Sequence, residues 1–295
     1  EDVTNTAPRT ALALRQSVRN KAKQLAQDMR IPLWQDEAVR NLAQDQLSPL
    51  HSVVMSNTPL DDVSESITLL PPEDIARFGF AIAAQLNSGL KAVDGFDKST
   101  QALISQIAED LKAAKSPLIV SGTAAQSADV INAAAAIAAA LEPETTSLSY
   151  CLPECNSLGV TLQSDGAHMS LSALCERAKK GEIYTLIVAE NDLYRRGPKE
   201  QIDTLLSNIK NVVVMDCIET ATFAQASLVL PAASSFESEG TLVSSEGRAQ
   251  RHFPVFLPAE DRRASWQWLT RLGQALNREG FADIKHFDDV LESCA

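Results

Sequence analysis

Short, continuously apolar segments alternate with helical patterns through the second half of the chain. Pro117–Ser121, Tyr184–Ala189 and Asn211–Met215 each have the length and composition of a buried strand. A strand that is apolar on both faces is typical of a parallel sheet whose two sides are covered by helices. Helical periodicity occupies Ser127–Leu141 and Lys199–Asn208, between these strands. We therefore predict an α/β fold with a mostly parallel sheet flanked by helices.

Weaker patterns extend this prediction along the chain. Further strands are expected at Thr145–Tyr150 and Leu228–Leu230. Further helices are expected at Met169–Lys180, Thr220–Ala226, Ser265–Leu276 and Phe287–Leu291.

The N-terminal part of the chain is richer in helical patterns than the rest. Helices are predicted at Arg9–Met29, Asp36–Gln46, from Pro72 onward and at Ser99–Lys115, with one strand at His51–Met55. No cluster of chemically reactive residues accompanies them in sequence. We therefore divide the chain into a helix-rich segment at 1–115 that completes an upstream domain, an α/β parallel-sheet domain at 116–247 and C-terminal helices at 248–295 packed on it.

The charge balance excludes several classes of partner. The net charge is −12 at pH 7 and the sequence pI is about 4.8. Nucleic-acid binding needs a basic surface, so a nucleic-acid partner is not expected. The same charge disfavours docking on anionic lipid. No apolar run approaches the ~20 residues that a membrane-spanning helix needs, so we expect no direct membrane insertion.

The cysteines and histidines do not form a recognisable catalytic or metal-binding pattern. The five cysteines are mostly far apart, and Cys151 and Cys155 lack the second pair that a zinc or iron–sulfur site normally needs. The four histidines show no HExxH spacing, and no G-x-S-x-G or Walker A motif is present. We therefore expect no catalytic residue and no metal ligand in this chain.

The stretch Leu228–Gln250, which reads LVLPAASSFESEGTLVSSEGRAQ, is the most distinctive part of the sequence. A strand ends at Pro231, and glycines then alternate with acids and an arginine. Ligand groups in α/β proteins usually lie just beyond strand ends. Alternatively, Gly240 and Gly247 only permit a positive φ, and Arg248 pairs with Glu246 or Glu239.

Several unusual residues of this stretch keep a spacing that resembles a known superfamily. The strand ending in Leu-Pro, the acid, Gly-Thr and then Glu-Gly-Arg-x-Gln are similar to the molybdopterin oxidoreductases. Within that superfamily the chain most resembles the C-terminal part of the large iron–sulfur subunits of bacterial respiratory complex I. Further similar segments are Ala38–Asn41, Pro59–Asp62, Pro72–Ala81, Pro117–Gly122 and Asn156–Gly159.

Two departures from the superfamily pattern bear on cofactor binding. Where the molybdenum enzymes end a strand in Gly-x-Asn-Pro, this chain reads Ala189-Glu190-Asn191-Asp192, which places a carboxylate on each side of Asn191. An anionic pyrophosphate would be repelled there. The family's usual asparagine before Glu-Gly-Arg is replaced by serine. The resemblance therefore implies a vestigial pterin site, with candidate residues Gly122, Asn191, Gly240 and Arg248.

The resemblance implies a scaffold role within NADH:quinone oxidoreductase, a proton-translocating complex. The segment itself would carry no cofactor, while iron–sulfur clusters would lie in the upstream part of the full subunit. Its partners would be other peripheral-arm subunits, on the cytoplasmic side of the bacterial inner membrane. The alternatives are a domain that still binds a molybdopterin dinucleotide and a free-standing small-molecule binder.

Two helices are candidate contact surfaces for such partners. The predicted helix at Arg9–Met29 carries Arg15, Arg19, Lys21 and Lys23 in an otherwise acidic chain. A solvated basic face is the common explanation for such a pattern, and an acidic partner is the alternative. The predicted helix at Ser265–Leu276 carries Trp266 and Trp268.

Overall fold

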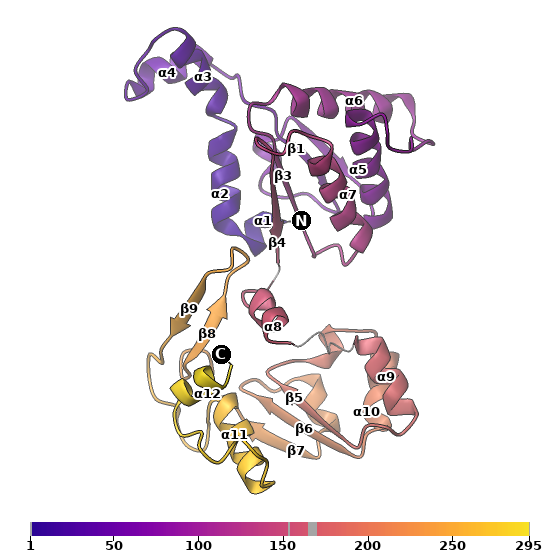
Figure 1. Cartoon of the computed structure of the whole chain (residues 1–295), viewed down its shortest axis with the longest axis vertical. Helices are drawn as coiled ribbons and strands as arrows, with labels where there is room; N and C mark the ends of the chain where they lie inside the picture. The colour runs from indigo at the N-terminus through magenta and orange to yellow at the C-terminus, as the bar shows by residue number, and fades with distance from the viewer. Residues whose placement is uncertain (1, 153, 165–169, 295) are drawn as a thin grey trace. The chain divides into compact units, whose positions relative to one another are not determined.

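The computed structural model describes residues 2–152, 154–164 and 170–294. The chain divides into two compact units, Glu1–Ser157 and Leu158–Ala295 (Figure 1). This division differs from the predicted boundaries at 115/116 and 247/248. The first difference arises because helices before residue 115 share one core with the strands and helix that follow it. The second arises because the strand at 249–252 pairs with the strand before it.

Unit 1 is a helix-rich α/β unit that begins with four helices before its first strand. Its elements are α1 (Val3–Thr6), α2 (Pro8–Ser17), α3 (Asn20–Asp28), α4 (Asp36–Ala43), β1 (His51–Val54), η1 (Asp61–Val63), β2 (Ser66–Leu69), α5 (Pro72–Leu86), α6 (Lys98–Ala113), β3 (Leu118–Gly122), α7 (Ala128–Ala139) and β4 (Ser147–Cys151). Helix α8 (Ser157–Gln163) follows at the division between the units.

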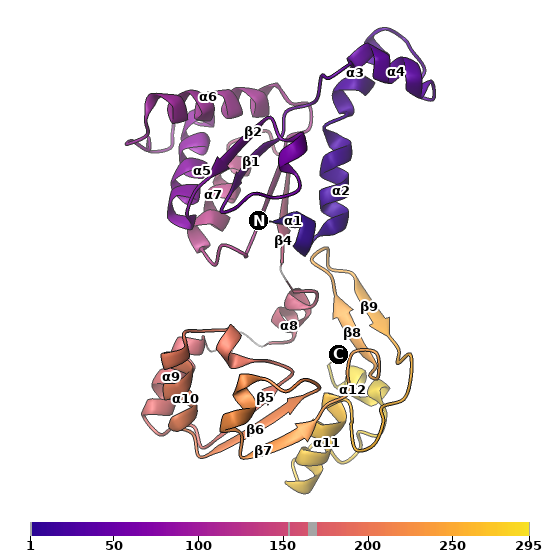
Figure 2. The same cartoon turned by 180° about the vertical axis from the view of Figure 1, so that it is seen from behind.

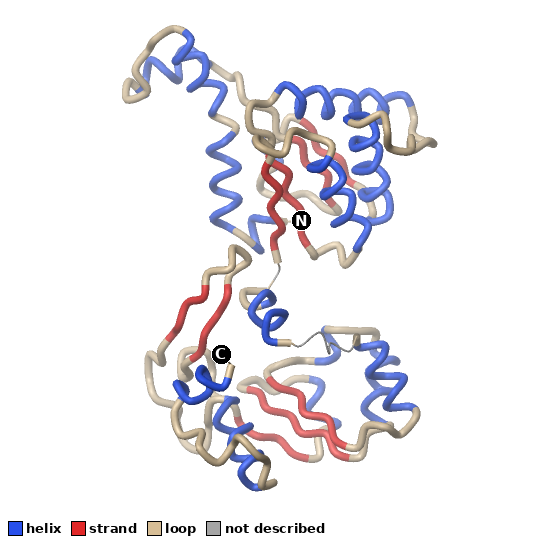
Figure 3. Tube along the Cα trace, viewed as in Figure 1, coloured by secondary structure: helices blue, strands red, loops and turns tan. Residues whose placement is uncertain are grey.

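The single long helix predicted at Arg9–Met29 is wrong. The chain forms α2 and α3 with a break at Val18 and Arg19 (Figure 3). The side chain of Val18 is buried, and its carbonyl accepts a hydrogen bond from the Ser48 N–H at 2.7 Å instead of from the next helical turn. A long-range backbone hydrogen bond therefore overrides the helical periodicity. One residue of the predicted basic face is already paired within unit 1, because the Arg15 guanidinium forms an ion pair with Asp62.

The core of unit 1 lies between α5, α6 and α7 and the strands they cover. Phe78, Ile82, Ile107 and Ile137 are among its buried side chains. Helices α5 and α7 pack so closely that a Cβ added at Gly79 would lie 2.9 Å from the Cβ of Ala133. Strands β1 and β2 pair in parallel, as do β3 and β4.

Unit 2 contains a three-stranded parallel sheet, followed by a hairpin and two helices. Its elements are α9 (Leu171–Lys179), β5 (Thr185–Ala189), η2 (Leu193–Arg195), α10 (Lys199–Ser207), β6 (Asn211–Asp216), η3 (Ala221–Gln225), β7 (Leu228–Pro231), β8 (Gly240–Val243), β9 (Ala249–His252), α11 (Ser265–Ala275) and α12 (Phe287–Ser293). The predicted helix start at Met169 lies outside the described residues. The predicted helix at Thr220–Ala226 forms as the 3-10 helix η3.

The strands of unit 2 are ordered β5–β6–β7, and each adjacent pair is parallel (Figure 2). Side chains from α9 and α10 pack on this sheet, including Cys175, Ile202 and Leu205 against Val188 and Val214. Among the described residues, β1 to β7 pair only in parallel, which confirms the predicted fold class. The parallel strands are divided among three sheets. In the described part of the chain, no helix is both long and apolar enough to cross a bilayer.

The close approach of α5 and α7 gives a direct test of the unit 1 core. Substituting Gly79→Val places a branched side chain against Ala133, so we expect a loss of about 1–3 kcal/mol in the free energy of unfolding. Chemical denaturation followed by circular dichroism measures this loss. The control is Ala135→Val, which adds methyl groups at an exposed position of α7. Equal stability of the two variants would contradict the packing described here.

Candidate functional site

The parallel strands β5, β6 and β7 end at the same edge of the unit 2 sheet, at Ala189, Asp216 and Pro231. Ligands of open α/β sheets usually bind beyond this edge. It is therefore the candidate functional site. In this protein, the residues that follow each strand form hydrogen bonds with other residues of the same chain.

Beyond β5, Glu190 has a φ of +48°, a strained conformation for a residue other than glycine. Its N–H donates to the Met215 carbonyl at 2.7 Å. Its carboxylate accepts a hydrogen bond from the hydroxyl of Ser265, the first residue of α11. Helix N-termini favour negative charge, so Glu190 takes a place that a bound anion could otherwise occupy.

Asp192 organises the loop after Glu190. Its Oδ1 accepts hydrogen bonds from the Tyr194 N–H at 3.2 Å and the Thr222 hydroxyl at 2.9 Å. Thr222 is fully buried, and its Oγ1 also accepts the Leu193 N–H at 3.0 Å. The Asp192 carboxylate therefore ties the loop after β5 to η3. It serves as a structural cap in this arrangement.

The segment that leads into α11 returns to the end of β7. Arg263 forms a parallel bridge with Ala232, donates its N–H to the Pro231 carbonyl at 3.2 Å and accepts the Ala233 N–H at 2.8 Å. The Trp268 Nε1–H donates to the same Pro231 carbonyl at 2.8 Å. Trp266 packs on Phe287, with ring centroids 5.9 Å apart. The two tryptophans are thus engaged within unit 2, which weakens their expected role as a partner surface.

The residues at the ends of the strands carry negative charge. Asp216 Oδ1 accepts the N–H groups of Cys217 and Ile218 at 2.7 and 3.2 Å. Cys217 is exposed, but partial desolvation by its neighbours raises the pKa of its thiol, and the charges of Asp216 and Glu190 raise that pKa further. The thiol is therefore kept protonated at neutral pH, and the edge presents negative charge.

Glu237 is buried and holds the loop between β7 and β8. Its carboxylate accepts the Ser234 N–H and hydroxyl, each at 3.0 Å, and pairs with Arg262 at 3.1 Å. The hydrogen bond from the Ser234 N–H is the main reason that the pKa of Glu237 lies below its ordinary value. Sequence reasoning placed this acid in the distinctive stretch but assigned it no role.

The four candidate residues of the vestigial pterin site are divided between the two units. Gly122 is the last residue of β3 and belongs to unit 1, whereas the other three belong to unit 2. The Asn191 Oδ1 accepts a hydrogen bond from the Arg196 Nε at 2.9 Å. Arg248 is exposed at the tip of the β8–β9 hairpin. Within the described ranges, no hydrogen bond or ion pair joins any two of Asn191, Gly240 and Arg248.

The two glycines of the distinctive stretch fit their positions for different structural reasons. Gly247 has a φ of +79° in a hairpin turn where its N–H donates to the Ser244 carbonyl at 2.9 Å. Gly240 does not have a positive φ, so that part of the prediction is wrong. It pairs with His252 across the hairpin, and a Cβ added at Gly240 would lie 2.5 Å from the His252 Nε2. Gly240 therefore provides room for the histidine ring.

The predicted pairing of Arg248 with Glu239 or Glu246 is also corrected. Arg251 pairs with Glu239 at 2.9 Å and with Asp288 of α12 at 2.5 Å. Its guanidinium lies 4.9 Å from the Phe253 ring centroid and 5.4 Å from that of Phe287. Arg248 lies in the turn, away from Glu239 at the other end of β8, and Arg251 lies on the paired strand. The carboxylates of Glu239 and Asp288 raise the pKa of Arg251.

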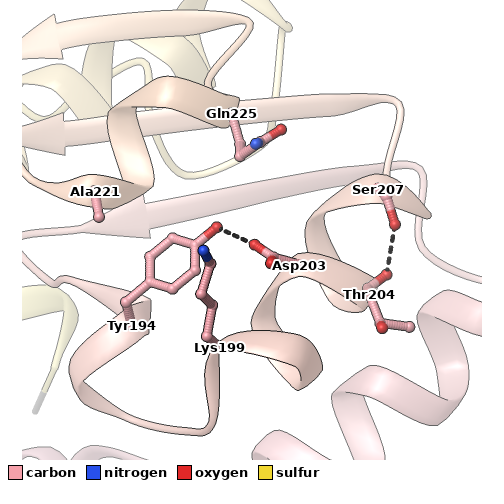
Figure 4. A pocket seen from close by; sticks show the side chains of 7 residues that line it. All are labelled: Tyr194, Lys199, Asp203, Thr204, Ser207, Ala221 and Gln225. Carbon is pink, nitrogen blue, oxygen red and sulfur yellow. Dashed lines mark hydrogen bonds between the residues drawn. The ribbon is translucent and has the colours of Figure 1, made fainter.

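A hollow of about 890 Å³ on unit 2 was not foreseen from the sequence (Figure 4). It lies on α10 and its neighbours and is lined by Tyr194, Lys199, Asp203, Thr204, Ser207, Ala221 and Gln225. The Tyr194 hydroxyl donates to Asp203 Oδ1 at 2.6 Å, and this hydrogen bond raises the pKa of Tyr194 to about 12. Tyr194 thus stays protonated at neutral pH.

Comparison with known proteins places this geometry in context. A family model described as molybdopterin oxidoreductase matches residues 95–275. The chain is 44% identical over 283 residues to the G subunit of NADH-quinone oxidoreductase from Pseudomonas fluorescens, a match that covers 94% of this chain and 31% of that protein. It is 38% identical over 301 residues to the corresponding protein of Escherichia coli, covering 99% of this chain and 33% of that protein.

The corresponding protein of Pseudomonas putida is 42% identical over 302 residues, covering 100% of this chain and 33% of that protein. The chain therefore spans about a third of the length of the curated relatives it matches. The resemblance inferred from the motifs is confirmed.

The ion pairs of Arg251 predict that it, rather than Arg248, stabilises unit 2. Arg251→Met removes the guanidinium shared by Glu239 and Asp288, so we expect the melting temperature to fall by several degrees. Arg248→Met is the matched control, because an exposed turn residue changes stability by no more than about 0.5 kcal/mol. Differential scanning fluorimetry compares the two. A larger effect of Arg248→Met would reverse the assignment.

The lowered pKa of Glu237 predicts a pH-dependent contribution to stability. A depressed folded-state pKa stabilises the fold above the ordinary value of 4.5, and this stabilisation is lost as pH falls through the folded value. We expect Glu237→Gln to lower the melting temperature at neutral pH, and this difference to shrink between about pH 5 and pH 3. The exposed Glu279→Gln serves as control. A difference that does not depend on pH would contradict this role.

Proposed function

The chain belongs to the molybdopterin oxidoreductase family, and we propose that it is a C-terminal scaffold segment of the large peripheral-arm subunit of an NADH:quinone oxidoreductase. It supports electron transfer from NADH to quinone without carrying a redox centre itself. The observation that carries this proposal is the match of nearly the whole chain to NADH-quinone oxidoreductase subunits from three bacteria.

The geometry of the candidate site supports a segment without a pterin cofactor. A molybdopterin dinucleotide is anionic, and its pyrophosphate needs free N–H donors or cations at the strand ends. Here the Glu190 carboxylate lies at the N-terminus of α11, and Asp216 accepts the N–H groups that follow β6. The side-chain Oδ1 of Asn191 accepts a hydrogen bond from the Arg196 Nε. The residues present do not fit the cofactor.

In this role the segment acts through its folded surface. The iron–sulfur clusters lie in the remaining two thirds of the full subunit, and the segment contributes no catalytic residue. Its partners are that cluster-bearing part and other peripheral-arm subunits of the complex. The assembly lies on the cytoplasmic side of the bacterial inner membrane, as a peripheral part of a membrane complex.

Cofactor analysis separates this proposal from a domain that binds molybdopterin. We expect the purified chain to contain less than about 0.1 equivalents of molybdenum, tungsten or pterin, because the strand ends repel its pyrophosphate. Inductively coupled plasma mass spectrometry and pterin oxidation fluorescence measure these contents. An active molybdopterin oxidoreductase prepared in the same way is the control. Stoichiometric metal and pterin in the chain would overturn the proposal.

Native purification tests the scaffold role itself. With an affinity tag on the chromosomal copy, we expect the chain to be recovered from solubilised membranes with an iron-containing assembly that oxidises NADH with a quinone acceptor. An untagged strain provides the control for non-specific recovery. Recovery as a monomer with no iron-containing partner would instead favour a free-standing small-molecule binder.

A further inference from the structure

Three residues of unit 1 that are distant in sequence place possible metal ligands together. His51 is the first residue of β1, Glu65 directly precedes β2, and Asp110 lies on α6. One ligand atom from each lies within 4.8 Å of the other two. The His51 Nε2 lies 3.0 Å from the Asp110 Oδ2. We propose that these residues form a binding site for a divalent transition-metal ion of the zinc class.

The fold of unit 1 holds the three side chains in place. Strand β1 pairs with β2 in parallel so that His51 is opposite Ser66, and the Glu65 N–H donates to the Leu50 carbonyl at 2.8 Å. Helix α6 supplies Asp110 and, one turn earlier, Gln106. The Gln106 Nε2 donates to the Glu65 Oε1 at 2.9 Å, which directs the Glu65 carboxylate toward the same turn of the helix.

The hydrogen bonds of His51 are compatible with metal binding through Nε2. The His51 Nδ1 lies 2.8 Å from the Ser66 hydroxyl oxygen, which can either donate or accept. Without metal, Nε2–H donates to Asp110 and Nδ1 accepts from Ser66. With metal on Nε2, the proton resides on Nδ1 and donates to Ser66. Metal-ligating histidines typically have such a partner for the second ring nitrogen.

Charge and burial also favour a cation at this position. The His51 side chain is only 10% exposed, so its ring is fixed by packing, while Asp110 is 31% exposed and Glu65 lies at the surface. Glu65 and Asp110 converge on one imidazole, and no lysine or arginine pairs with either carboxylate in the described residues.

The donor set indicates the class of metal. One imidazole nitrogen and two carboxylate oxygens suit zinc and neighbouring transition metals, whereas magnesium and calcium prefer oxygen ligands alone. Tetrahedral ligand atoms about 2.1 Å from zinc lie about 3.4 Å apart. The 3.0 Å between the His51 Nε2 and the Asp110 Oδ2 is close to this separation. The Glu65 oxygen lies within 4.8 Å of the other two ligand atoms. The exposed Glu65 side chain therefore needs to move by up to about 1.4 Å, and water takes the fourth position.

Zinc titration of the chain tests the site independently of the proposed function in the respiratory complex. The tag-free chain is stripped with chelator and titrated with Zn²⁺ in a competition assay, and Co²⁺ absorption reports the coordination geometry. The test variants are Glu65→Gln and Asp110→Asn, both at side chains that retain solvent exposure. Glu109→Gln, an exposed carboxylate next to Asp110 on α6, is the matched control. Circular dichroism confirms that each variant is folded.

We expect the wild-type chain to bind one equivalent of Zn²⁺ and to give a tetrahedral Co²⁺ spectrum. Each test variant should bind at least about tenfold more weakly, as lost ligands usually cause, while Glu109→Gln binds as the wild type does. Absence of stoichiometric binding by the wild-type chain would overturn the proposal. So would equal loss of affinity in Glu109→Gln and Glu65→Gln, because the affinity would then come from general surface charge.

Discussion

The return of the chain to the end of β7 is the constraint on which the arrangement of unit 2 depends. A parallel sheet leaves the donors and acceptors after its strands unpaired, and most α/β proteins use that edge for a ligand. Here the backbone of Arg263 pairs with Pro231 and Ala233, and the Trp268 indole donates to the same Pro231 carbonyl. These bonds fix the start of α11, and that position brings Ser265 to the carboxylate of Glu190. The backbone groups at the end of β7 are thus paired with groups of the chain itself.

The acidic residues at this edge also form interactions that a bound ligand could otherwise form. A carboxylate at a helix N-terminus interacts favourably with the helix dipole, and a carboxylate that accepts N–H groups replaces a phosphate in its hydrogen bonding. Glu190, Asp192 and Asp216 each use one of these interactions. A cofactor would have to displace them and would also meet their charge. Under the proposed function, these internal groups provide the interactions that a ligand would otherwise provide at this edge.

The sequence was sufficient where the determining pattern is local. Continuous apolar runs identified β3, β5 and β6 and their parallel pairing, since strands of this kind need both faces covered. The sequence was insufficient where a residue far away in the sequence determines the local structure. The break between α2 and α3 depends on a hydrogen bond from Ser48, and the ion pairs of Arg251 depend on a hairpin register and on Asp288. The same limit hid the cluster of His51, Glu65 and Asp110, because nothing in their spacing shows that α6 lies against the start of β1.

The glycines of the distinctive stretch have structural roles that do not depend on the family's cofactor. Gly247 provides the left-handed turn of the β8–β9 hairpin, and Gly240 leaves space for His252 on the paired strand. Both requirements come from the hairpin alone. Replacing either glycine would strain the hairpin whether or not a pterin is bound. The motif therefore indicates which family the chain descends from. Whether a cofactor fits depends instead on whether the N–H groups beyond the strand ends are free and on the charge around them.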